Sequence, residues 1–176
     1  GWELHHPIEM QNYIFDLLMD AGQELNIKPF GIRAMDSLRL EKSYRLIPRE
    51  LSIEYSAHES GLNRFVQMQK ENFIGRTALA ERQASPNWRF VTLEVHDVTD
   101  ADARGSEPIR CNGKLIGRAT SGGYGWRLRK SLAMAMVRPD FGEVGTVLEI
   151  FILGQPHRAT IIQDTPFDTN NERLKA

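Results

Sequence analysis

The sequence of 176 residues predicts an α+β protein in which a helical region precedes a small antiparallel β-barrel. Two observations predict this order. Residues 8–25 and residues 31–44 each carry apolar side chains at steps of three and four, which is the spacing of an amphipathic helix. After Pro86-Asn87 the pattern changes to short alternating runs separated by glycine. We therefore expect an α/β region over residues 1–84 and a barrel over residues 85–176.

The first region is expected to hold a short strand and three helices. Trp2–His6 is a strand candidate that ends at Pro7. A helix is predicted over residues 8–25, because its apolar side chains form one stripe. That stripe consists of Ile14, Leu17, Leu18, Ala21 and Leu25. The third and shortest helix is predicted over residues 77–83.

The second helix is predicted from about Gly31 to Tyr44, and its two sides differ in character. The apolar side consists of Ile32, Met35 and Leu38. The charged residues Arg39, Glu41 and Lys42 are expected to be exposed.

The second region reads as a succession of short strands. Asn112-Gly113 is a strong signal for a two-residue hairpin turn, and Gly154-Gln155 is expected to form another. The expected strands cover residues 89–95, 115–119, 131–137, 146–152 and 157–162. Short strands at this spacing favour a small barrel or sandwich.

Charge and composition exclude several classes of function. The formal net charge of −1 provides no field that would attract nucleic acid or an anionic membrane. No apolar run is long enough to span a bilayer, and the N-terminus does not resemble a signal peptide. The single cysteine, Cys111, cannot form an internal disulfide, which fits a reducing compartment. We expect a cytoplasmic protein, or a protein of the mitochondrial matrix if it is eukaryotic. The opening Gly-Trp-Glu-Leu reads as the middle of a motif, so we expect part of a longer protein.

Metal and nucleophile chemistry are not indicated. His5 and His6 are adjacent, the other histidines are isolated, and no zinc-ligand spacing is present. We expect no metal site. Cys111 precedes a predicted turn and has no marked base nearby, so an incidental thiol is favoured over a nucleophile.

Two further stretches allow a structural and a functional interpretation. Thr120–Gly125 is rich in glycine and is predicted to be a tight turn with positive φ, the alternative being a loop shaped to approach a ligand or a neighbouring domain. Arg127, Arg129 and Lys130 form either solvated surface or a docking patch for an anionic tail or partner. Arg110, Lys114 and Arg118 would add to that patch if the hairpin folds nearby.

Glu3 is an acidic residue within an apolar and aromatic run. By strand alternation its side chain faces solvent. Alternatively it faces a cavity and accepts two hydrogen bonds from a planar pair of N–H groups, such as a pterin or guanine ring presents.

An ordered set of motifs resembles the glycine cleavage T-protein family of aminomethyltransferases. Ala34–Lys42 is similar to that family's D-S-L-R-L-E helix. The stretches that follow in the family's order are Glu59–Leu62, Phe73–Leu79, Gly117–Gly122 and Gly145-Thr146. Each motif is weak alone, but the ordered set covers almost the whole chain.

Two details resemble the dimethylglycine and sarcosine dehydrogenase branch. Glu41–Arg45 is similar to its E-K-x-Y/F-R motif, and Pro166–Leu174 is similar to its C-terminal motif. Met35 stands where glycine cleavage proteins carry a folate-binding arginine. Arg33 lies two residues earlier, and we do not expect it to take over folate binding. The chain also lacks the aromatic C-terminal stretch of those proteins.

The resemblance implies tetrahydrofolate-dependent one-carbon transfer from an amine or iminium substrate. It implies that residues 1–84 are the C-terminal part of the folate-binding domain and that residues 85–176 are the family's barrel. Glu3 matches the glutamate that holds the pterin ring, and Tyr44 is a candidate to stack on the ligand or to pack in the core. The catalytic acid is implied to lie upstream, in a missing N-terminal part, with FAD only if an oxidase domain precedes it.

Two other readings stay open. One is a binding module of the kind found in relatives of this fold that act in iron–sulfur assembly or tRNA modification. Those relatives carry a motif that contains a cysteine, whereas the corresponding stretch here, Lys70–Thr77, contains no cysteine. The other is a non-catalytic folate-binding or scaffold module of the same fold.

Overall fold

The computed structural model describes residues 2–175, which form two compact units, Gly1–Ile32 and Arg33–Ala176. In the first unit, a 3₁₀ turn at Ile8–Met10 leads into α1 (Gln11–Ala21), and a second 3₁₀ turn follows at Gln23–Leu25. The helix predicted over residues 8–25 is therefore present, with a 3₁₀ turn at each end of the α-helix. No residue of α1 is buried within this unit.

The strand predicted at Trp2–His6 is not formed. These residues have no regular secondary structure, and Trp2 is 99% exposed. A strand needs a neighbour to pair its backbone N–H and C=O groups, and the described residues of the first unit, 2–32, contain no strand that could pair with it.

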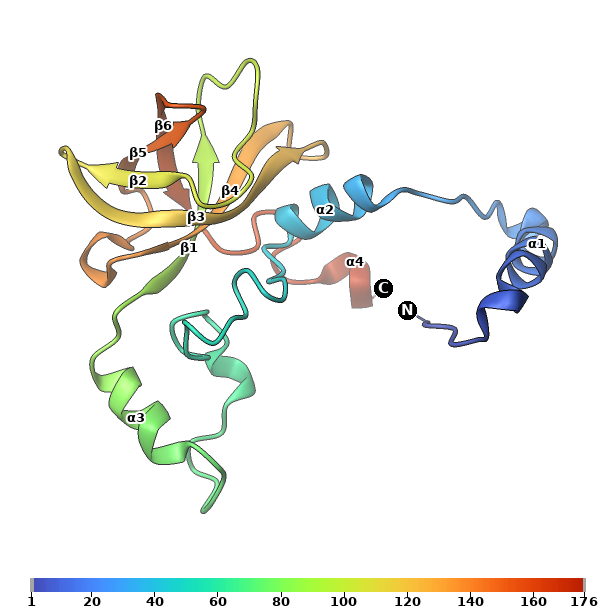
Figure 1. Cartoon of the computed structure of the whole chain (residues 1–176), viewed down its shortest axis with the longest axis horizontal. Coiled ribbons are helices and arrows are strands. Elements are labelled where there is room, and N and C mark those ends of the chain that lie inside the picture. The colour runs from blue at the N-terminus through green and yellow to red at the C-terminus, as the bar shows by residue number, and fades with distance from the viewer. Residues whose placement is uncertain (1, 176) are drawn as a thin grey trace. The chain divides into compact units, whose positions relative to one another are not determined.

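The second unit begins with helices and continues into the barrel (Figure 1). Its helices are α2 (Ile32–Glu41), α3 (Arg76–Ala84) and a single C-terminal turn, α4 (Glu172–Lys175). Its strands are β1 (Arg89–Val95), β2 (Pro108–Cys111), β3 (Lys114–Gly125), β4 (Lys130–Val137), β5 (Val147–Ile152) and β6 (Gln155–Ile162). The predicted order, helices followed by an antiparallel barrel, is confirmed.

The six strands close on themselves in the order β1-β4-β3-β2-β5-β6, with antiparallel pairs throughout. β1 pairs with β4 on one side and with β6 on the other, and this second pairing closes the barrel. In this closed order every strand has a hydrogen-bonded neighbour strand on each side.

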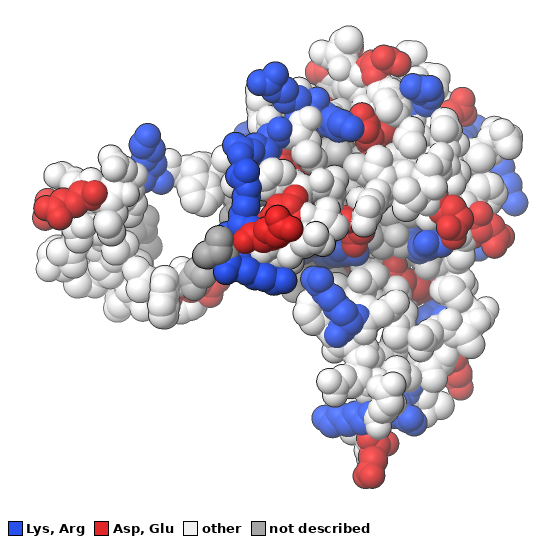
Figure 2. Space-filling view, turned by 180° about the vertical axis from the view of Figure 1, so that it is seen from behind, with Lys and Arg blue, Asp and Glu red and all other residues white. Residues whose placement is uncertain are grey.

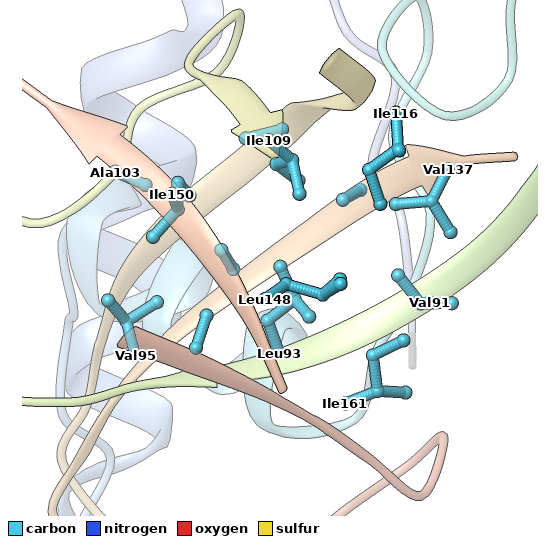
Figure 3. Packing of buried hydrophobic residues seen from close by; sticks show 14 of the residues in the cluster. Val91, Leu93, Val95, Ala103, Ile109, Ile116, Val137, Leu148, Ile150 and Ile161 are labelled. Atoms are coloured by element: carbon cyan, nitrogen blue, oxygen red, sulfur yellow. The ribbon is translucent and has the colours of Figure 1, made fainter. Parts of the chain in front are cut away.

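The barrel interior is filled by branched apolar side chains that alternate along each strand (Figure 3). Val91, Leu93 and Val95 of β1 point inward, and Ile109, Leu148 and Ile150 meet them from the strands of the other side. This alternation is the reason that the barrel strands were recognisable from sequence.

β4 is buried on both faces. Ala133, Ala135 and Val137 face the interior, while Leu132, Met134 and Met136 lie outside the barrel in a second apolar cluster with Phe90 and Leu40. Leu40 belongs to α2, so this cluster attaches the helix to the outer surface of the sheet.

Turn chemistry was predicted correctly at one hairpin and nearly so at another. Asn112 and Gly113 both have positive φ, at 49° and 76°, as a two-residue turn between β2 and β3 requires. At the β5–β6 hairpin the positive φ values belong to Leu153 and Gly154, one residue earlier than expected.

The prediction of a tight turn at Thr120–Gly125 was wrong, because β3 runs through these residues. Among the glycines here, Gly122, Gly123 and Gly125 do not have positive φ. Their small size is what matters: a methyl group on Gly122 would lie 2.4 Å from the carbonyl oxygen of Ala103. The glycines let neighbouring backbone approach the strand closely. Within residues 2–175, no helix is both long and apolar enough to cross a membrane.

Candidate functional site

The charged residues of α2 are not exposed as predicted. Glu41 is 1% exposed, and the side chains of Arg39 and Lys42 are 11% and 14% exposed. The helix turns Ser37, Leu40 and Glu41 toward the barrel. The apolar side, Ile32, Met35 and Leu38, stays open at 73%, 49% and 56%. The prediction failed because polar groups on the outside of the barrel require partners from this helix.

Glu41 holds the turn between β3 and β4. Its Oε1 accepts hydrogen bonds from the backbone N–H groups of Arg127, at 2.6 Å, and Leu128, at 2.9 Å. One turn earlier on the helix, the Ser37 hydroxyl donates to the Tyr124 carbonyl at 2.7 Å and accepts from the Trp126 N–H at 3.3 Å. Together these bonds fasten α2 to the β3–β4 turn.

A second buried carboxylate, Glu50, links α2 to the glycine-rich part of β3. Glu50 is completely buried and accepts from the Ser121 hydroxyl at 2.6 Å and from the Leu46 N–H at 2.9 Å. Arg39 donates to the same hydroxyl at 3.1 Å and to Asp36 at 2.8 Å. Because buried charges are tolerated only when they are paired and hydrogen-bonded, this network fixes the helix in one position.

The end of α2 also binds the C-terminal segment. The Lys42 ammonium donates to the carbonyls of Phe167 and Asp168, at 3.2 and 2.8 Å, and to the Asn171 side chain at 2.7 Å. Arg45 pairs with Asp164 at 2.8 Å. The two sequence stretches that resemble the dehydrogenase branch are therefore in direct contact.

Glu59, in the Glu-Ser-Gly-Leu motif, anchors the start of β1. One carboxylate oxygen accepts from the N–H groups of Asn87 and Trp88, at 2.8 and 3.1 Å, and the other accepts from Ser56 at 2.9 Å. Burial on its own would raise the pKa of Glu59, but the hydrogen bonds from Ser56, Asn87 and Trp88 outweigh it and lower the pKa below its ordinary value.

The two residues predicted to bind folate lie in different units. Glu3 belongs to the first unit; its side chain is 89% exposed, and the His5 ring nitrogen lies 3.6 Å from its carboxylate. Tyr44 follows α2 in the second unit and is 46% exposed. The Tyr44 side chain is thus not among the buried residues of either apolar cluster.

The basic residues flagged in the sequence do not act as one group. Lys130 pairs with Glu94 at 2.7 Å, and the Arg127 guanidinium lies 5.7 Å from the centre of the Phe167 ring. Arg118 pairs with Glu54, and its hydrogen bonds to the Tyr55 hydroxyl raise the pKa of the guanidinium further. On the face drawn in Figure 2, basic and acidic side chains lie in small groups of either sign.

A cleft of about 400 Å³ lies beside these contacts, between α2, residues 100–104 and the end of β3. Sequence reasoning did not identify it, nor did it identify Glu41 and Glu50 as buried. Glu41 and Glu59 carried a signal through their places in recognised motifs, whereas Glu50 carried none. Within residues 2–175, no group of three or more His, Cys, Asp or Glu side chains is arranged to hold a metal ion.

A closed six-stranded barrel with a helix clamped to its outer face by buried carboxylates defines the class of protein. The family model described as the GCVT N-terminal domain matches residues 1–70, and that of the glycine cleavage T-protein C-terminal barrel domain matches residues 89–168. The chain belongs to the glycine cleavage T-protein family.

Curated relatives from two groups are similar to the chain. It is 40% identical to the mitochondrial dimethylglycine dehydrogenase of Homo sapiens over 165 residues, which cover 93% of the chain and 19% of that protein. It is 32% identical to an aminomethyltransferase of Desulfitobacterium hafniense over 163 residues, which cover 92% of the chain and 44% of that protein. The chain thus spans less than half the length of these relatives.

A solved structure shares the fold. The glycine cleavage system aminomethyltransferase T of Bartonella henselae superposes with a TM-score of 0.81 at 24% identity, over 93% of the chain and 45% of that structure.

Proposed function

We propose that the chain takes part in tetrahydrofolate-dependent one-carbon transfer, as the C-terminal part of a larger aminomethyltransferase-like or dimethylglycine dehydrogenase-like protein. The observation that carries this proposal is the match of two family models in the family's order. The functional division that we propose places the folate-binding part in residues 1–84 and the barrel in residues 85–176. The matches, which end at residue 70 and begin again at residue 89, support it.

Glu3 is proposed to hold the flat edge of the pterin ring. Its carboxylate is open to solvent, and the His5 ring, 3.6 Å away, is its one charged or potentially charged neighbour within 4 Å among residues 2–175. Both oxygens can therefore accept from a ring N–H and an exocyclic amine, which is the donor pair that a pterin offers. Tetrahydrofolate, when bound, supplies the nitrogen nucleophiles that receive the one-carbon unit. Glu3 orients the ring, and Tyr44 offers a half-exposed aromatic face for stacking.

The exposed apolar surfaces support a proposed partner, namely an N-terminal part such as the longer relatives have. α1 exposes Leu17 and Leu18 at 52% and 44%, and α2 exposes Met35 and Leu38 at 49% and 56%. Surfaces of this kind are costly in water unless another surface covers them. The proposed N-terminal part would cover them, enclose the folate and bring the catalytic acid and the amine or iminium substrate. FAD is proposed only for a protein that also carries an oxidase domain.

The test is a folate titration of the longer protein. The Glu3→Gln variant is expected to bind the stable 5-formyl derivative of tetrahydrofolate roughly ten- to a hundredfold more weakly, because a charge-assisted bidentate contact is lost. Glu9→Gln is the matched control, an exposed glutamate six residues away, and should keep the affinity.

Two results would argue against the proposal in different ways. Unchanged affinity in Glu3→Gln would reject the assignment of Glu3. No saturable folate binding by the unmodified protein would favour the scaffold reading instead.

A further inference from the structure

The outer face of β2, β5 and β6 carries another cavity, whose walls include no residue of α2. Its volume is about 480 Å³, and its walls include Arg110 of β2, Glu149 of β5 and Arg158 of β6. β5 lies between the other two strands (Figure 1). Because Leu148 and Ile150 of β5 point into the barrel, Glu149 between them points outward. A cavity of this volume is of the size that small-molecule sites occupy.

The strand register places one arginine on each side of the carboxylate. Arg110 is the partner of Glu149 in the β2–β5 pair, and Arg158 is its partner in the β5–β6 pair. Residues paired in this way lie on the same face of a sheet. Since neighbouring strands lie about 4.8 Å apart, the two arginine backbones are separated by about 10 Å, a gap that two long side chains can close from both ends.

The positive charge of this row is not neutralised within the described protein. Among residues 2–175, the ion pairs with N–O distances up to 4.0 Å involve other side chains and none of Arg110, Glu149 and Arg158. If Glu149 turned to one guanidinium, the other would still keep its charge, because arginine stays protonated in proteins. All three residues are exposed, so a ligand can reach them.

Both arginines start from fixed positions. The guanidinium carbon of Arg110 lies 5.3 Å from the centre of the Phe151 ring, which is two residues beyond Glu149 on β5. A guanidinium that lies over a ring uses its face for that contact and keeps its N–H groups, which lie in its plane, for an oxyanion. The backbone of Arg158 is held by β1, since its carbonyl accepts from the His96 N–H at 2.8 Å.

The other walls that face outward are apolar or form a turn. Val147, which is 53% exposed, and Pro156 lie beside the charged row on β5 and β6. The Asn112-Gly113 turn borders the cavity at the end of β2. An oxyanion between the arginines would leave the apolar walls uncovered, so the cavity suits an anion that carries an organic group.

We propose that this cavity binds a small organic phosphate ester, with its phosphate between Arg110 and Arg158 and its organic group against Val147 and Pro156. A phosphate group has three terminal oxygens and can accept from two guanidiniums at once, whereas a single bidentate arginine occupies both oxygens of a carboxylate. Glu149 repels the phosphate and limits the affinity. The inference goes beyond the folate proposal, because none of these residues is assigned to folate.

The experiment observes the aromatic protons of phenyl phosphate by saturation-transfer NMR with the intact protein, at low ionic strength, where exposed charges are least screened. Phenyl phosphate is expected to bind saturably. Benzoate carries a carboxylate on the same ring, and benzyl alcohol carries no charge, so both are expected to bind at least several times more weakly. Inorganic phosphate should compete with phenyl phosphate, but with several times lower affinity because it lacks the ring.

Variants then locate the site. Arg110→Gln and Arg158→Gln should each weaken phenyl phosphate binding about three- to tenfold, since each removes a charge-assisted contact at an exposed position. Glu149→Gln should strengthen binding by a similar factor, and damage to the fold cannot imitate such a gain. Arg64→Gln is the matched control for the arginines, because Arg64 is exposed and lies over the Phe65 ring outside the cavity.

A further control separates the local charge from the net charge. Glu24→Gln changes the net charge by as much as Glu149→Gln, at an exposed position outside the cavity, and should leave the affinity unchanged. The proposal is overturned if phenyl phosphate does not bind saturably, or if benzoate or inorganic phosphate binds as tightly. Unchanged affinity in both arginine variants, or equal gains in Glu149→Gln and Glu24→Gln, would also overturn it.

Discussion

The ammonium of Lys42 donates a hydrogen bond to the side-chain oxygen of Asn171, 2.7 Å away and 129 residues later in the chain. Lys42 ends the motif of α2, and Asn171 lies in the C-terminal motif. Two stretches that look independent in the sequence are thus the two sides of one contact, which attaches the C-terminal segment to the residue that follows α2.

This contact predicts the effect of Lys42→Met, which keeps the length of the side chain but removes its three donors. The C-terminal segment, residues 164–175, should lose its attachment and exchange its amide hydrogens faster. We expect a loss of about 2 kcal/mol in the free energy of unfolding, because charge-assisted bonds to half-buried acceptors are lost. Lys114→Met, at an exposed position, should change neither quantity by a comparable amount. Equal exchange rates in Lys42→Met and the unmodified protein would show that the segment is held otherwise.

The carboxylate of Glu41 is predicted to contribute strongly to the stability of the folded protein. Glu41→Ala leaves the N–H groups of Arg127 and Leu128 without their acceptor, and we expect a loss of about 2–4 kcal/mol in chemical denaturation. Glu41→Gln keeps an oxygen acceptor and should recover part of that loss. Glu24→Ala, at an exposed position outside α1 and α2, is the control. If the free energy of unfolding changes no more in Glu41→Ala than in this control, the hydrogen bonds of Glu41 to the β3–β4 turn do not stabilise the fold.

These contacts show which features could be predicted from sequence. The strands and the Asn112-Gly113 turn depend on alternation and on the φ values of two adjacent residues, which are local properties. The burial of Glu41 depends on backbone N–H groups 86 and 87 positions away, and the size limit at Gly122 depends on the Ala103 carbonyl. Nothing in the immediate sequence distinguishes such residues from a solvated glutamate or a turn glycine. The cleft was missed for the same reason, since its walls come from three separate segments.

Glu59 gives a prediction for the pH dependence of stability. The pKa of this carboxyl group is lower in the folded protein than its ordinary value of 4.5. The unfolded chain therefore binds the proton more readily, and the contribution of Glu59 to stability is complete above about 4.5 and is lost as the pH falls through the folded-state pKa.

Unfolding measured between neutral and acidic pH checks this sign. The unmodified protein should lose stability below the ordinary carboxyl pKa, and Glu59→Gln should lose less over the same range while being less stable at neutral pH. The same slope in both proteins would show that other groups cause the acid sensitivity.

Gly122 is predicted to be constrained by space and not by backbone angle. In Gly122→Ala the new methyl group would meet the Ala103 carbonyl oxygen at 2.4 Å, and because both are tied to backbone, one segment must move. We expect a loss of about 1–3 kcal/mol, which is the usual cost of overpacking. Gly31→Ala has no atom within 4 Å of the new methyl group and serves as the control. Equal stability of the two variants would show that residues 101–103 yield without cost.

The exposed apolar side of α2 predicts a difference between the 176-residue chain and a longer protein that contains it. Leu38 is 56% exposed and is proposed to face the N-terminal part. Leu38→Glu should therefore leave the unfolding of the 176-residue chain almost unchanged, whereas it should destabilise the longer protein by about 2–3 kcal/mol, because a charge would be buried at the contact. The same longer protein should transfer one-carbon units, and the 176-residue chain should not, since the proposed catalytic acid lies upstream. Equal effects of Leu38→Glu in both proteins would remove α2 from the proposed contact, and one-carbon transfer by the 176-residue chain would place the catalytic residues within it.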